Sequence, residues 1–504
     1  MPDLTNPSHP ITRRRLLAAG LGTAALATLA GCTSPPPRLI SPTSSAVTTA
    51  EEARRSTGRV VSATLNAQPM QLDLAGKMAN TWAFGSTPAP TIRVSAGDTV
   101  LAQVTNQLPD PTSVHWHGVA LRNDMDGVPP LTQKAIAPDN SFAYKFIAEH
   151  PGTYWFHPHV GTQLDRGLYG ALIVEDPHDP LRYDEEWVVV LDDWLDGVTA
   201  TPDQVLKQFS KGMASMGMDG MLMRMGNMLM GTNSPLLGGD TGDVYYPEYL
   251  INGRPPADPE TFTAKPGSRI RIRFINAGGD TAFRVALGGH ALTITHTDGY
   301  PVEPKDVDSV LLGMGERYDV IVTAGDGVFP LVASAEGKDA AGFALLRTAA
   351  GTAPAPTTSI PELVSSRVGT ADQLATASAV RLRSKPVDRT LTMKLSGDMS
   401  SYDWAINNRR FDIKKPLQDA LRVRKGERVR LKLVNDTKMW HPMHLHGHTY
   451  QHPNGGPRKD TSIVLPGKTL QVEFDADNPG QWLSHCHNIY HGESGMMTVV
   501  AYER

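Results

Sequence analysis

Four histidine pairs with the pattern His-x-His occur toward the two ends of the sequence. The pairs are His115 and His117, His157 and His159, His444 and His446, and His485 and His487. In a β-strand, residues i and i+2 point to the same side, about 6.5–7 Å apart, so one pair can contact two neighbouring metal ions. Eight imidazoles are too many for one ion and fit three, and imidazole binds copper, zinc, iron and nickel. The pattern therefore predicts a cluster of three metal ions.

The last of these pairs encloses a cysteine and is followed by further metal-binding side chains. Cys486 lies between the two histidines, His491 and Met496 follow it, and His441 precedes the third pair. One thiolate, two imidazoles and one thioether are the ligand set of a blue-copper electron-transfer site. A zinc site would be expected to have more thiolates or carboxylates. We therefore predict a copper ion at these four residues, with Cys486 giving electrons a short covalent path to the cluster.

These pairs stand at matching positions in a sequence that repeats three times. Each copy begins with Gly, ends with Asn nine residues later and partly alternates apolar and polar residues, at 97–106, 267–276 and 426–435. Such alternation is typical of a strand that is buried on one face. A histidine pair follows the first and third copies at offsets of nine and eleven residues, where the middle copy has Val285 and Leu287. We expect an all-β fold with domains at 55–178, 186–350 and 385–504 and a linker at 351–384.

Length and composition are consistent with this organisation. The chain has 504 residues, 40% of them hydrophobic and 20% charged, which suits about three globular domains. Only Cys32 and Cys486 are present, so a disulfide framework is excluded. The net charge of -4 gives no indication of a nucleic-acid partner.

The first 31 residues resemble an export signal of the twin-arginine, lipoprotein type. Three arginines at 13–15 precede an apolar run to Ala30, which is too short to cross a bilayer as a stable helix. Leu29-Ala30-Gly31-Cys32 looks like a bacterial lipobox, in which Cys32 becomes the acylated N-terminus. We expect an exported protein on the periplasmic side of the cell envelope, anchored to the membrane by lipid, with 32–54 as a flexible tether. Ordinary signal cleavage near Cys32 is the alternative.

Taken in order, the motifs at 115–118, 157–159, 441–446 and 485–496 resemble the four copper signatures of the multicopper oxidases. The resemblance implies three cupredoxin-like Greek-key domains and four copper ions, with the three-copper cluster between the first and third domains. It also implies one-electron oxidation of a substrate coupled to reduction of dioxygen to water. It assigns the type 1 copper to His441, Cys486, His491 and Met496, and the type 2 copper to His115 and His444. It assigns the two type 3 coppers to His117, His157, His159, His446, His485 and His487, in a division that stays open.

Two carboxylates are candidate proton donors, since reduction of dioxygen to water consumes four protons. Asp126 follows the first motif at the position of the family's proton-relay carboxylate, although an Asp-Gly turn is the alternative. Gly492 stands where some relatives have an acidic residue, and Glu493, one position later, is expected to replace it as a proton donor. The family commonly has a small polar residue between the two histidines of the second pair. Pro158 stands there in this sequence, and it should stiffen the turn without removing a ligand.

A methionine-rich segment at 213–230 indicates the substrate. Gaps of two and three residues do not keep one face of a helix, and three glycines weaken a helix further. Thioethers favour cuprous copper, so we expect a loop that captures Cu(I), as the resemblance to exported bacterial cuprous oxidases of copper tolerance also implies. A helix that packs its methionines against the protein is the alternative. The capture residues would be Met213, Met216, Met218, Met221, Met223, Met225, Met228 and Met230.

Other functions have to be weighed against cuprous oxidation. A laccase would oxidise phenols in an open pocket near the type 1 copper. A two-domain copper nitrite reductase is disfavoured because such enzymes lack the full set of eight paired histidines. A lipoprotein that only sequesters copper would explain the methionines but not a three-copper cluster.

Overall fold

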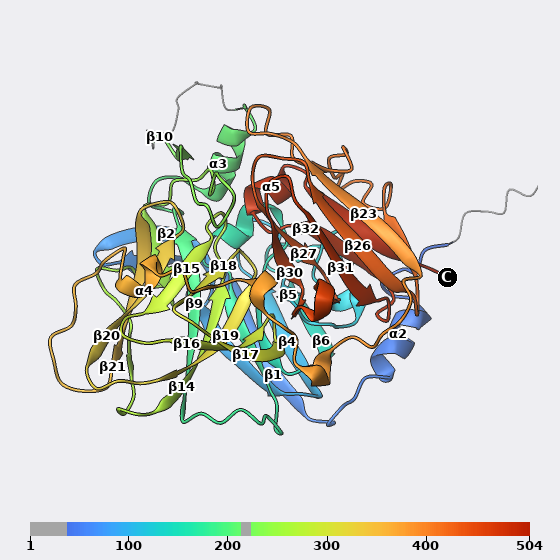
Figure 1. The fold of residues 1–504 in the computed structure, drawn as a ribbon. Coiled ribbons are helices and arrows are strands. Elements are labelled where there is room, and N and C mark those ends of the chain that lie inside the picture. Colours follow the sequence, from blue (N-terminus) through green and yellow to red (C-terminus); the bar gives the residue numbers. More distant parts are fainter. Residues whose placement is uncertain (1–37, 213–222) are drawn as a thin grey trace, which may run out of the picture. The chain divides into compact units, whose positions relative to one another are not determined.

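A computed structural model describes residues 38–212 and 223–504. The predicted signal, Cys32 and four of the predicted capture residues, Met213, Met216, Met218 and Met221, lie outside the described residues. Residues Leu39–Glu503 form a compact unit that consists mainly of strands (Figure 1). In the part of the chain that the structure describes, no helix is both long enough and apolar enough to span a membrane.

The first third of the chain folds into two four-stranded sheets with the orders β2-β1-β4-β6 and β3-β8-β7-β5. The strands are β1 Val60–Leu74, β2 Lys77–Phe84, β3 Ala89–Ser95, β4 Asp98–Asn106, β5 His115–His117, β6 Ser141–Ala148, β7 Gly152–His157 and β8 Gly170–Glu175. In the second sheet, strand β5 carries both members of the first histidine pair, and strand β7 ends at the first member of the second pair.

The middle third forms two six-stranded sheets, β12-β9-β14-β19-β16-β17 and β13-β21-β20-β15-β18-β22, and a separate β10-β11 hairpin. The strands are β9 Glu185–Trp194, β10 Met223–Met225, β11 Met228–Met230, β12 Glu248–Ile251, β13 Thr261–Thr263, β14 Arg269–Asn276, β15 Phe283–Leu287, β16 Leu292–Thr297, β17 Tyr300–Val307, β18 Ser309–Leu312, β19 Arg317–Thr323, β20 Val328–Ala335, β21 Ala340–Arg347 and β22 Val368–Gly369.

The last third again forms two sheets, β24-β23-β26-β31-β28-β29 and β25-β33-β32-β27-β30. The strands are β23 Arg389–Ser396, β24 Ala405–Ile406, β25 Leu421–Arg424, β26 Arg428–Asn435, β27 His441–Leu445, β28 Tyr450–Gln451, β29 Arg458–Lys459, β30 Thr461–Val464, β31 Thr469–Asp475, β32 Gln481–Cys486 and β33 Met497–Glu503. Strands β23, β26 and β31 lie side by side in Figure 1.

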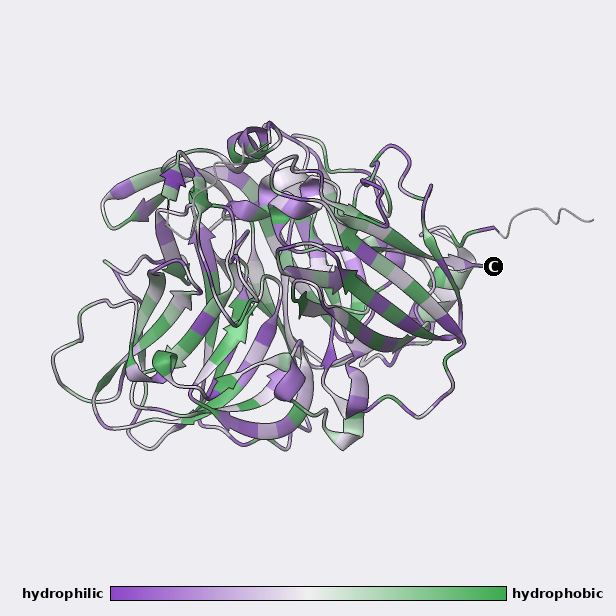
Figure 2. Ribbon diagram, turned by 45° about the horizontal axis from the view of Figure 1, so that its top comes forward, coloured by the Kyte–Doolittle hydropathy of each residue, from purple (hydrophilic) through white to green (hydrophobic). Residues whose placement is uncertain are grey.

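The three thirds share one strand plan, which confirms the predicted all-β fold. The repeated strand, β4, β14 or β26, pairs in parallel with one neighbour and antiparallel with the other in each copy. Alternating burial along β4 and β26 follows the alternation of apolar and polar residues. Hydrophobic and hydrophilic bands alternate in the same way along strands in Figure 2. The exact domain boundaries stay a prediction.

The asparagine that ends each repeated strand fixes the loop that follows. Asn435 donates from Nδ2 to the carbonyl oxygens of Met439 at 2.7 Å and Val464 at 2.9 Å. Asn106 and Asn276 make the same pair of contacts in their own copies. Because each asparagine joins its loop to a later segment of the same region, it determines where the next strand begins. In the first and third copies that next strand, β5 or β27, carries histidines.

The middle copy differs from the expectation that the repeated strand is buried on only one face. Strand β14 is buried almost throughout, and Arg271 and Arg273 are each 3% exposed. Both guanidinium groups pair with Asp319, and Arg273 also donates to Thr153 of the first third at 2.9 Å. Charged residues on this face are therefore buried between domains, where ion pairs compensate their loss of water.

Short helices complete the described part of the chain. The helices are α2 Ser45–Glu52, α3 Pro202–Phe209, α4 Pro361–Val364 and α5 Ile489–Glu493, with single turns η1 Asn123–Met125, η2 Gly161–Asp165, η3 Ala371–Gln373, η4 Ser378–Val380 and η5 Pro453–Gly455. The flexible tether expected at 32–54 is therefore wrong for residues 45–52. Helix α2 buries Val47 in the core, and Glu51 accepts from the backbone of Ile147, so these contacts order the segment.

Candidate metal centre

Antiparallel strand pairs place the histidines of each terminal third opposite one another. Strand β5 pairs with β7, which puts His115 opposite His157. Strand β27 pairs with β32, which puts His444 opposite His485. The second member of each pair follows two positions later in the chain. Each terminal third therefore presents four imidazoles together.

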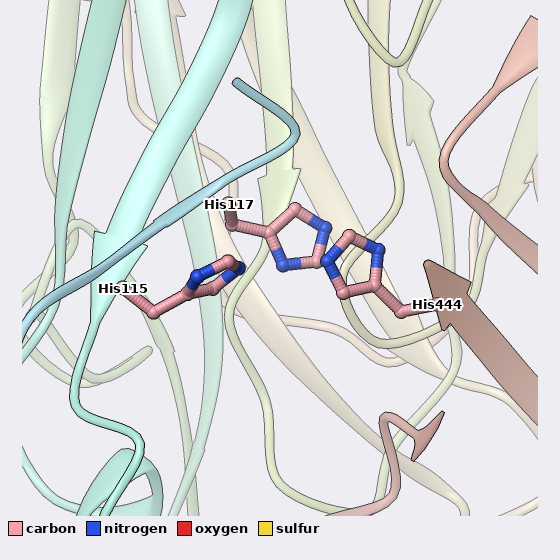
Figure 3. Close-up of side chains that lie close together, drawn as sticks. All are labelled: His115, His117 and His444. Atoms are coloured by element: carbon pink, nitrogen blue, oxygen red, sulfur yellow. The ribbon is translucent and has the colours of Figure 1, made fainter. Parts of the chain in front are cut away.

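The imidazoles of the first and last thirds meet face to face. The rings of His117 and His444 are stacked, with centroids 3.8 Å apart and an interplanar angle of 12° (Figure 3). The rings of His115 and His446 are also stacked, with centroids 3.8 Å apart. Seven of the eight paired histidines are buried and His159 is half-buried. The structure thus brings all four pairs into one buried cluster between β-sheets from the two ends of the chain.

Within this cluster the ring nitrogens fall into groups of three. In each group one ligand atom from each residue lies within 4.8 Å of the others. The groups are His115, His117 and His444; His117, His157 and His487; and His159, His446 and His485. The second and third groups contain all six histidines that the resemblance assigns to the type 3 pair. The geometry therefore favours one division of those six residues, which the sequence left open.

Several buried ring nitrogens in the cluster have no hydrogen-bond partner. Among the described residues these include Nε2 of His115, His157 and His444 and Nδ1 of His117. The opposite nitrogen of His157 lies 2.8 Å from the Pro158 carbonyl oxygen, and such a carbonyl accepts only from an N–H. The tautomer that satisfies this contact leaves a bare lone pair on Nε2. Unpaired lone pairs that point into one buried space fit a site for cations.

The clearest example is the group of His159, His446 and His485. Nε2 of His485 lies 3.1 Å from Nε2 of His446 and 3.4 Å from Nε2 of His159. Nδ1 of His485 faces the Cys486 carbonyl oxygen at 2.9 Å, and Nδ1 of His446 faces a carboxylate oxygen of Asp126 at 3.0 Å. Both Nδ1 atoms therefore carry the proton, and the two Nε2 lone pairs face each other. A cation between them would turn this repulsion into coordination.

Burial also keeps these imidazoles in the form that binds metal. Loss of water lowers the pKa of His157, His446, His485 and His487 well below the usual value, and the neighbouring histidines lower the pKa values further. The rings are consequently neutral at physiological pH. Neutral imidazole is the ligand form, so no proton has to be displaced from the ring when a metal ion binds.

A second group surrounds Cys486, on the strand that carries the last histidine pair. Its Sγ lies 3.6 Å from Nδ1 of His441 and 3.8 Å from Nδ1 of His491. All three residues are completely buried, and burial raises the pKa of the Cys486 thiol well above its usual range. Met496 is also completely buried, and its carbonyl oxygen accepts from the Cys486 backbone N–H at 3.0 Å. The structure therefore places all four predicted type 1 ligands in one region.

The cap of helix α5 positions His491. Asn488 Oδ1 accepts from the backbone N–H groups of Tyr490 at 3.1 Å and His491 at 3.2 Å. Asp280 of the middle third accepts from Asn488 Nδ2 at 2.6 Å. A hydrogen-bonded N-cap of this kind fixes the first turn of a helix. It therefore fixes the direction in which the His491 ring leaves the backbone.

Asp126 lies beside two imidazoles of the histidine cluster, a position that a simple turn does not require. Its Oδ2 lies 3.0 Å from Nδ1 of His446 and its Oδ1 lies 3.2 Å from Nδ1 of His115. The carboxylate is completely buried. One carboxylate thus lies beside imidazoles from both ends of the chain.

Glu493 lies on the outer side of the cluster. It is half-buried and lines a cavity of about 150 Å³ together with His159 and with apolar residues such as Leu131 and Leu483. Burial raises the pKa of Glu493 to about 7, with a smaller contribution from the negative charge of Asp203. A carboxyl with this pKa exchanges its proton near neutral pH, and it lines the same cavity as His159.

The described part of the methionine-rich segment approaches the Cys486 group. Strands β10 and β11 form a hairpin in which Met225 is 42% exposed and Met228 is buried. The next residue, Leu229, donates its backbone N–H to the Asp243 carbonyl oxygen at 2.7 Å. Asp243 Oδ2 in turn lies 3.4 Å from Nε2 of His491. The hairpin differs from the expected loop, because Met223 to Met230 pair as antiparallel strands.

Sequence reasoning missed two buried carboxylates, Asp243 and Asp460. Asp460 contacts His117 through Oδ1 at 3.1 Å, and its carbonyl oxygen lies 3.0 Å from Nδ1 of His444. Neither carboxylate belongs to a histidine motif. The pairing of β27 with β30 places Thr461 opposite His444 and so brings Asp460 beside the cluster, a register that no local pattern reveals.

Comparisons with known proteins agree with this geometry. Three family models, each described as multicopper oxidase, match residues 66–179, 185–351 and 384–504. The chain is 47% identical over 511 residues to Multicopper oxidase MmcO of Mycobacterium tuberculosis, with 100% of both chains covered. It is 29% identical over 530 residues to a copper resistance protein A homolog of Pseudomonas syringae pv. tomato, covering 83% of this chain and 88% of the relative.

Solved structures give the same result for the fold. A multi-copper oxidase from Pseudomonas thermotolerans is 25% identical with a TM-score of 0.65, covering 88% of this chain and 99% of that one. A laccase from Botrytis aclada is similar in fold, with a TM-score of 0.72 at 24% identity, covering 91% and 90%. The chain therefore belongs to the multicopper oxidases, as an oxygen-dependent oxidoreductase with cupredoxin-like β domains that uses copper.

Proposed function

We propose that this protein oxidises Cu(I) and passes the electrons, one at a time, to a site where dioxygen is reduced to water, as a contribution to copper tolerance. The observation that carries the proposal is the single buried cluster of eight imidazoles joined by Cys486 to a separate site with one thiolate and two imidazoles. Four bound copper ions would supply the four-electron chemistry. The roles of metal ligand, proton donor and substrate ligand described below belong to side chains of this chain.

The ligand geometry supports an arrangement of one type 1, one type 2 and two type 3 coppers. The type 1 ligands would be His441, Cys486, His491 and Met496, and the type 2 ligands His115 and His444. The type 3 ligands would be His117, His157 and His487 for one ion and His159, His446 and His485 for the other. This division follows the groups of ring nitrogens described above.

Protons would reach the cluster through carboxylates on two sides of it. Asp126 holds Nδ1 of His446 through its carboxylate and Nδ1 of His115 through its backbone carbonyl oxygen, and so has a direct path to the cluster. Glu493 would exchange protons with water in the cavity that it shares with His159. Since each turnover consumes four protons in a region without exposed imidazoles, fixed proton donors are chemically required.

The surroundings of His491 support Cu(I) rather than a bulky organic molecule as the electron donor. His491 is completely buried, and the Trp404 ring lies over it with centroids 4.3 Å apart. Asp243 contacts Nε2 of His491 and receives a backbone hydrogen bond from the methionine hairpin. A metal ion held by thioethers and this carboxylate would be close enough to pass an electron to His491. The names of the relatives, copper resistance protein A among them, point the same way.

An oxygen electrode tests the proposed function. Copper-loaded protein should consume dioxygen with Cu(I), and more slowly with Fe(II) or a phenol, when the three donors are compared side by side. A protein that only sequesters copper would bind Cu(I) without consuming dioxygen. Faster turnover with the phenol would instead identify a laccase.

We also propose that the protein is exported to the periplasmic side of the cell envelope and anchored by a lipid on Cys32. The twin-arginine and lipobox patterns at 13–15 and 29–32 support this placement. Replacing Cys32→Ala should release the protein from the membrane fraction without changing its activity. Membrane association that persists in this variant would exclude the lipid anchor.

A further inference from the structure

We propose that Asp460 and Arg317 position the imidazoles of His117 and His444, so that the middle domain, which supplies no predicted copper ligand, fixes the geometry of the three-copper cluster. This inference rests on the proposed metal sites. It assigns a positioning role to a buried ion pair and leaves the reacting atoms to the ligands themselves.

Asp460 reaches two imidazoles that the proposal gives to different copper ions. Its Oδ1 lies 3.1 Å from Nε2 of His117 and 3.4 Å from Nδ1 of His444. The Asp460 carbonyl oxygen lies 3.0 Å from the same Nδ1 atom, and Thr461 Oγ1 lies 3.1 Å from Nε2 of His117. One short segment therefore holds a type 2 ligand and a type 3 ligand at the same time.

These contacts select opposite tautomers in the two rings. Nε2 of His117 donates toward Asp460, which leaves Nδ1 bare, and this Nδ1 has no partner. Nδ1 of His444 donates toward Asp460, which leaves Nε2 bare, and this Nε2 also has no partner. The unprotonated nitrogen is the one that can bind metal. The free nitrogen is therefore Nδ1 in His117 and Nε2 in His444, although the two rings are stacked.

Arg317 of strand β19 holds the Asp460 carboxylate with two parallel hydrogen bonds. Nη1 donates to Oδ1 at 2.7 Å and Nη2 donates to Oδ2 at 2.6 Å, and both side chains are completely buried. A two-pronged contact of this kind fixes orientation as well as charge. The carboxylate therefore keeps one direction.

The middle domain also holds the backbone of this segment. Asp298 Oδ2 accepts from the backbone N–H groups of Asp460 and Thr461, each at 3.1 Å. Lys459 Nζ lies 3.2 Å from Asp298 and 3.1 Å from Glu316, and all of these groups are buried. The segment 459–461 is thus fixed to the middle domain through backbone and side chains, and Asp298 also accepts from the Arg317 backbone N–H at 2.9 Å.

Two glycines allow this close approach. A Cβ on Gly315 would lie 2.9 Å from a carbon of His487 and 3.0 Å from a carbon of His117. A Cβ on Gly118 would lie even closer to the Arg317 guanidinium and 2.7 Å from Asp460. Both glycines also have positive φ values, which a larger residue adopts only with strain. The middle domain therefore packs directly against the imidazoles, with no space between them for adjustment.

The test uses the full-length copper-loaded protein and an internal reference. Asp460→Asn keeps the shape of the side chain and removes its charge. We expect copper at the cluster to be lost to a chelator about 10- to 100-fold more readily, because partners of metal ligands typically contribute this much. The EPR signal of type 2 copper should shift and the near-ultraviolet absorption of the coupled pair should weaken. The blue absorption of the Cys486 centre should stay unchanged.

Asp319→Asn is the matched control. Asp319 is a buried carboxylate in a pair with Arg271 and Arg273, and no contact joins it to a histidine of the cluster. Its loss should lower stability without changing the type 2 signal. If both variants altered that signal equally, the effect would be a general loss of packing and the proposal would be overturned.

A second pair of variants keeps the test decisive if Asp460→Asn, which removes the carboxylate that accepts two hydrogen bonds from Arg317, does not fold. Arg317→Met combined with Asp460→Asn removes both charges, a change that buried pairs often tolerate. Arg317→Lys keeps a cation but loses the two-pronged contact. Either variant with wild-type copper content and an unchanged type 2 signal would contradict the proposal. Wild-type protein without a three-copper cluster would instead contradict the proposed function itself.

Discussion

The Nδ1 atoms of His441 and His491 lie 3.2 Å apart, and each ring can hold its proton on the other nitrogen, Nε2. Nε2 of His441 has Thr437 Oγ1 at 2.8 Å, and Nε2 of His491 has Asp243 Oδ2 at 3.4 Å. With both outer nitrogens engaged, two bare Nδ1 lone pairs face each other beside Cys486 Sγ. In the histidine cluster the Nε2 atoms of His446 and His485 face each other in the same way. The structure therefore has two places where lone pairs of neutral imidazoles face each other, and a cation at either place would be stabilised.

Removal of one cluster ligand should separate electron entry from dioxygen reduction. His159→Ala takes one imidazole from the group with His446 and His485 and leaves the Cys486 site intact. We expect dioxygen consumption to fall by more than about 100-fold, because loss of a ligand should exceed the effect of losing one of its partners. The blue absorption and its bleaching by a reductant should persist. The exposed His178 provides the control, and equal losses in His178→Ala and His159→Ala would refute the assignment.

Glu493→Gln should change how turnover depends on pH. Burial raises the pKa of Glu493 to about 7, so the carboxyl holds its proton below that pH and loses it as the pH rises. A proton donor is therefore loaded on the acid side, and wild-type turnover should decline above about pH 7. Glutamine cannot donate a proton in this way, so the variant should be slower by on the order of 100-fold at acid pH and lack that decline.

The pH profile of dioxygen consumption under saturating donor checks this prediction. The exposed Glu52 gives a matched control, since Glu52→Gln makes the same substitution outside every histidine motif of the sequence. A Glu493→Gln profile that coincides with the wild-type profile would exclude Glu493 as a proton donor. The same measurement on Asp126→Asn tests the second carboxylate, and unchanged turnover there would exclude the relay role.

Replacing the eight methionines of 213–230 by leucine should impair Cu(I) oxidation selectively. Leucine keeps apolar volume and removes the thioether, so the change tests metal capture rather than packing. We expect the rate at low Cu(I) to fall by roughly 10-fold or more, while the rate with a small organic reductant stays within about two-fold, since only the former donor uses soft ligands. Asp243→Asn should act in the same direction. An unchanged rate with Cu(I) in the methionine variant would refute the capture role.

The repeated asparagine should contribute to stability in the domain without copper ligands. Asn276→Ala removes the donor for the carbonyl oxygens of Thr281 and Leu312, which lie in buried surroundings. We expect the free energy of unfolding to fall by about 1–3 kcal/mol, the usual effect of leaving a buried polar group unsatisfied. Thermal denaturation checks this, with the exposed Asn80→Ala as a control that should have little effect. A midpoint equal to wild type in Asn276→Ala would contradict the structural role.

The sequence predicted the strands and ligands whose signal is local. The strands at 97–106, 267–276 and 426–435 could be predicted because alternation and a fixed Gly-to-Asn spacing are read within ten residues. The residues around Cys486 could be proposed as ligands because they stand within one short segment. In both cases the chemistry of neighbouring residues was sufficient.

Features that depend on contacts between distant segments could not be predicted. Asp460 lies beside His117 only because β30 pairs with β27, and Arg317 reaches it from another domain. Arg273 looks like a solvent-facing residue of an alternating strand, yet it is buried and donates to Thr153 of the first domain. Helix α2 was missed because a Ser/Thr-rich composition suggests a tether, whereas burial of Val47 orders it. Tertiary contacts decide each of these cases.

Anomalous X-ray scattering at the copper absorption edge, from crystals of the copper-loaded protein, tests the central claim most directly. The account predicts four peaks per chain, one beside Cys486 Sγ and three enclosed by the eight paired histidines. A single peak at Cys486, or a histidine cluster that stays empty in fully loaded active protein, would contradict it.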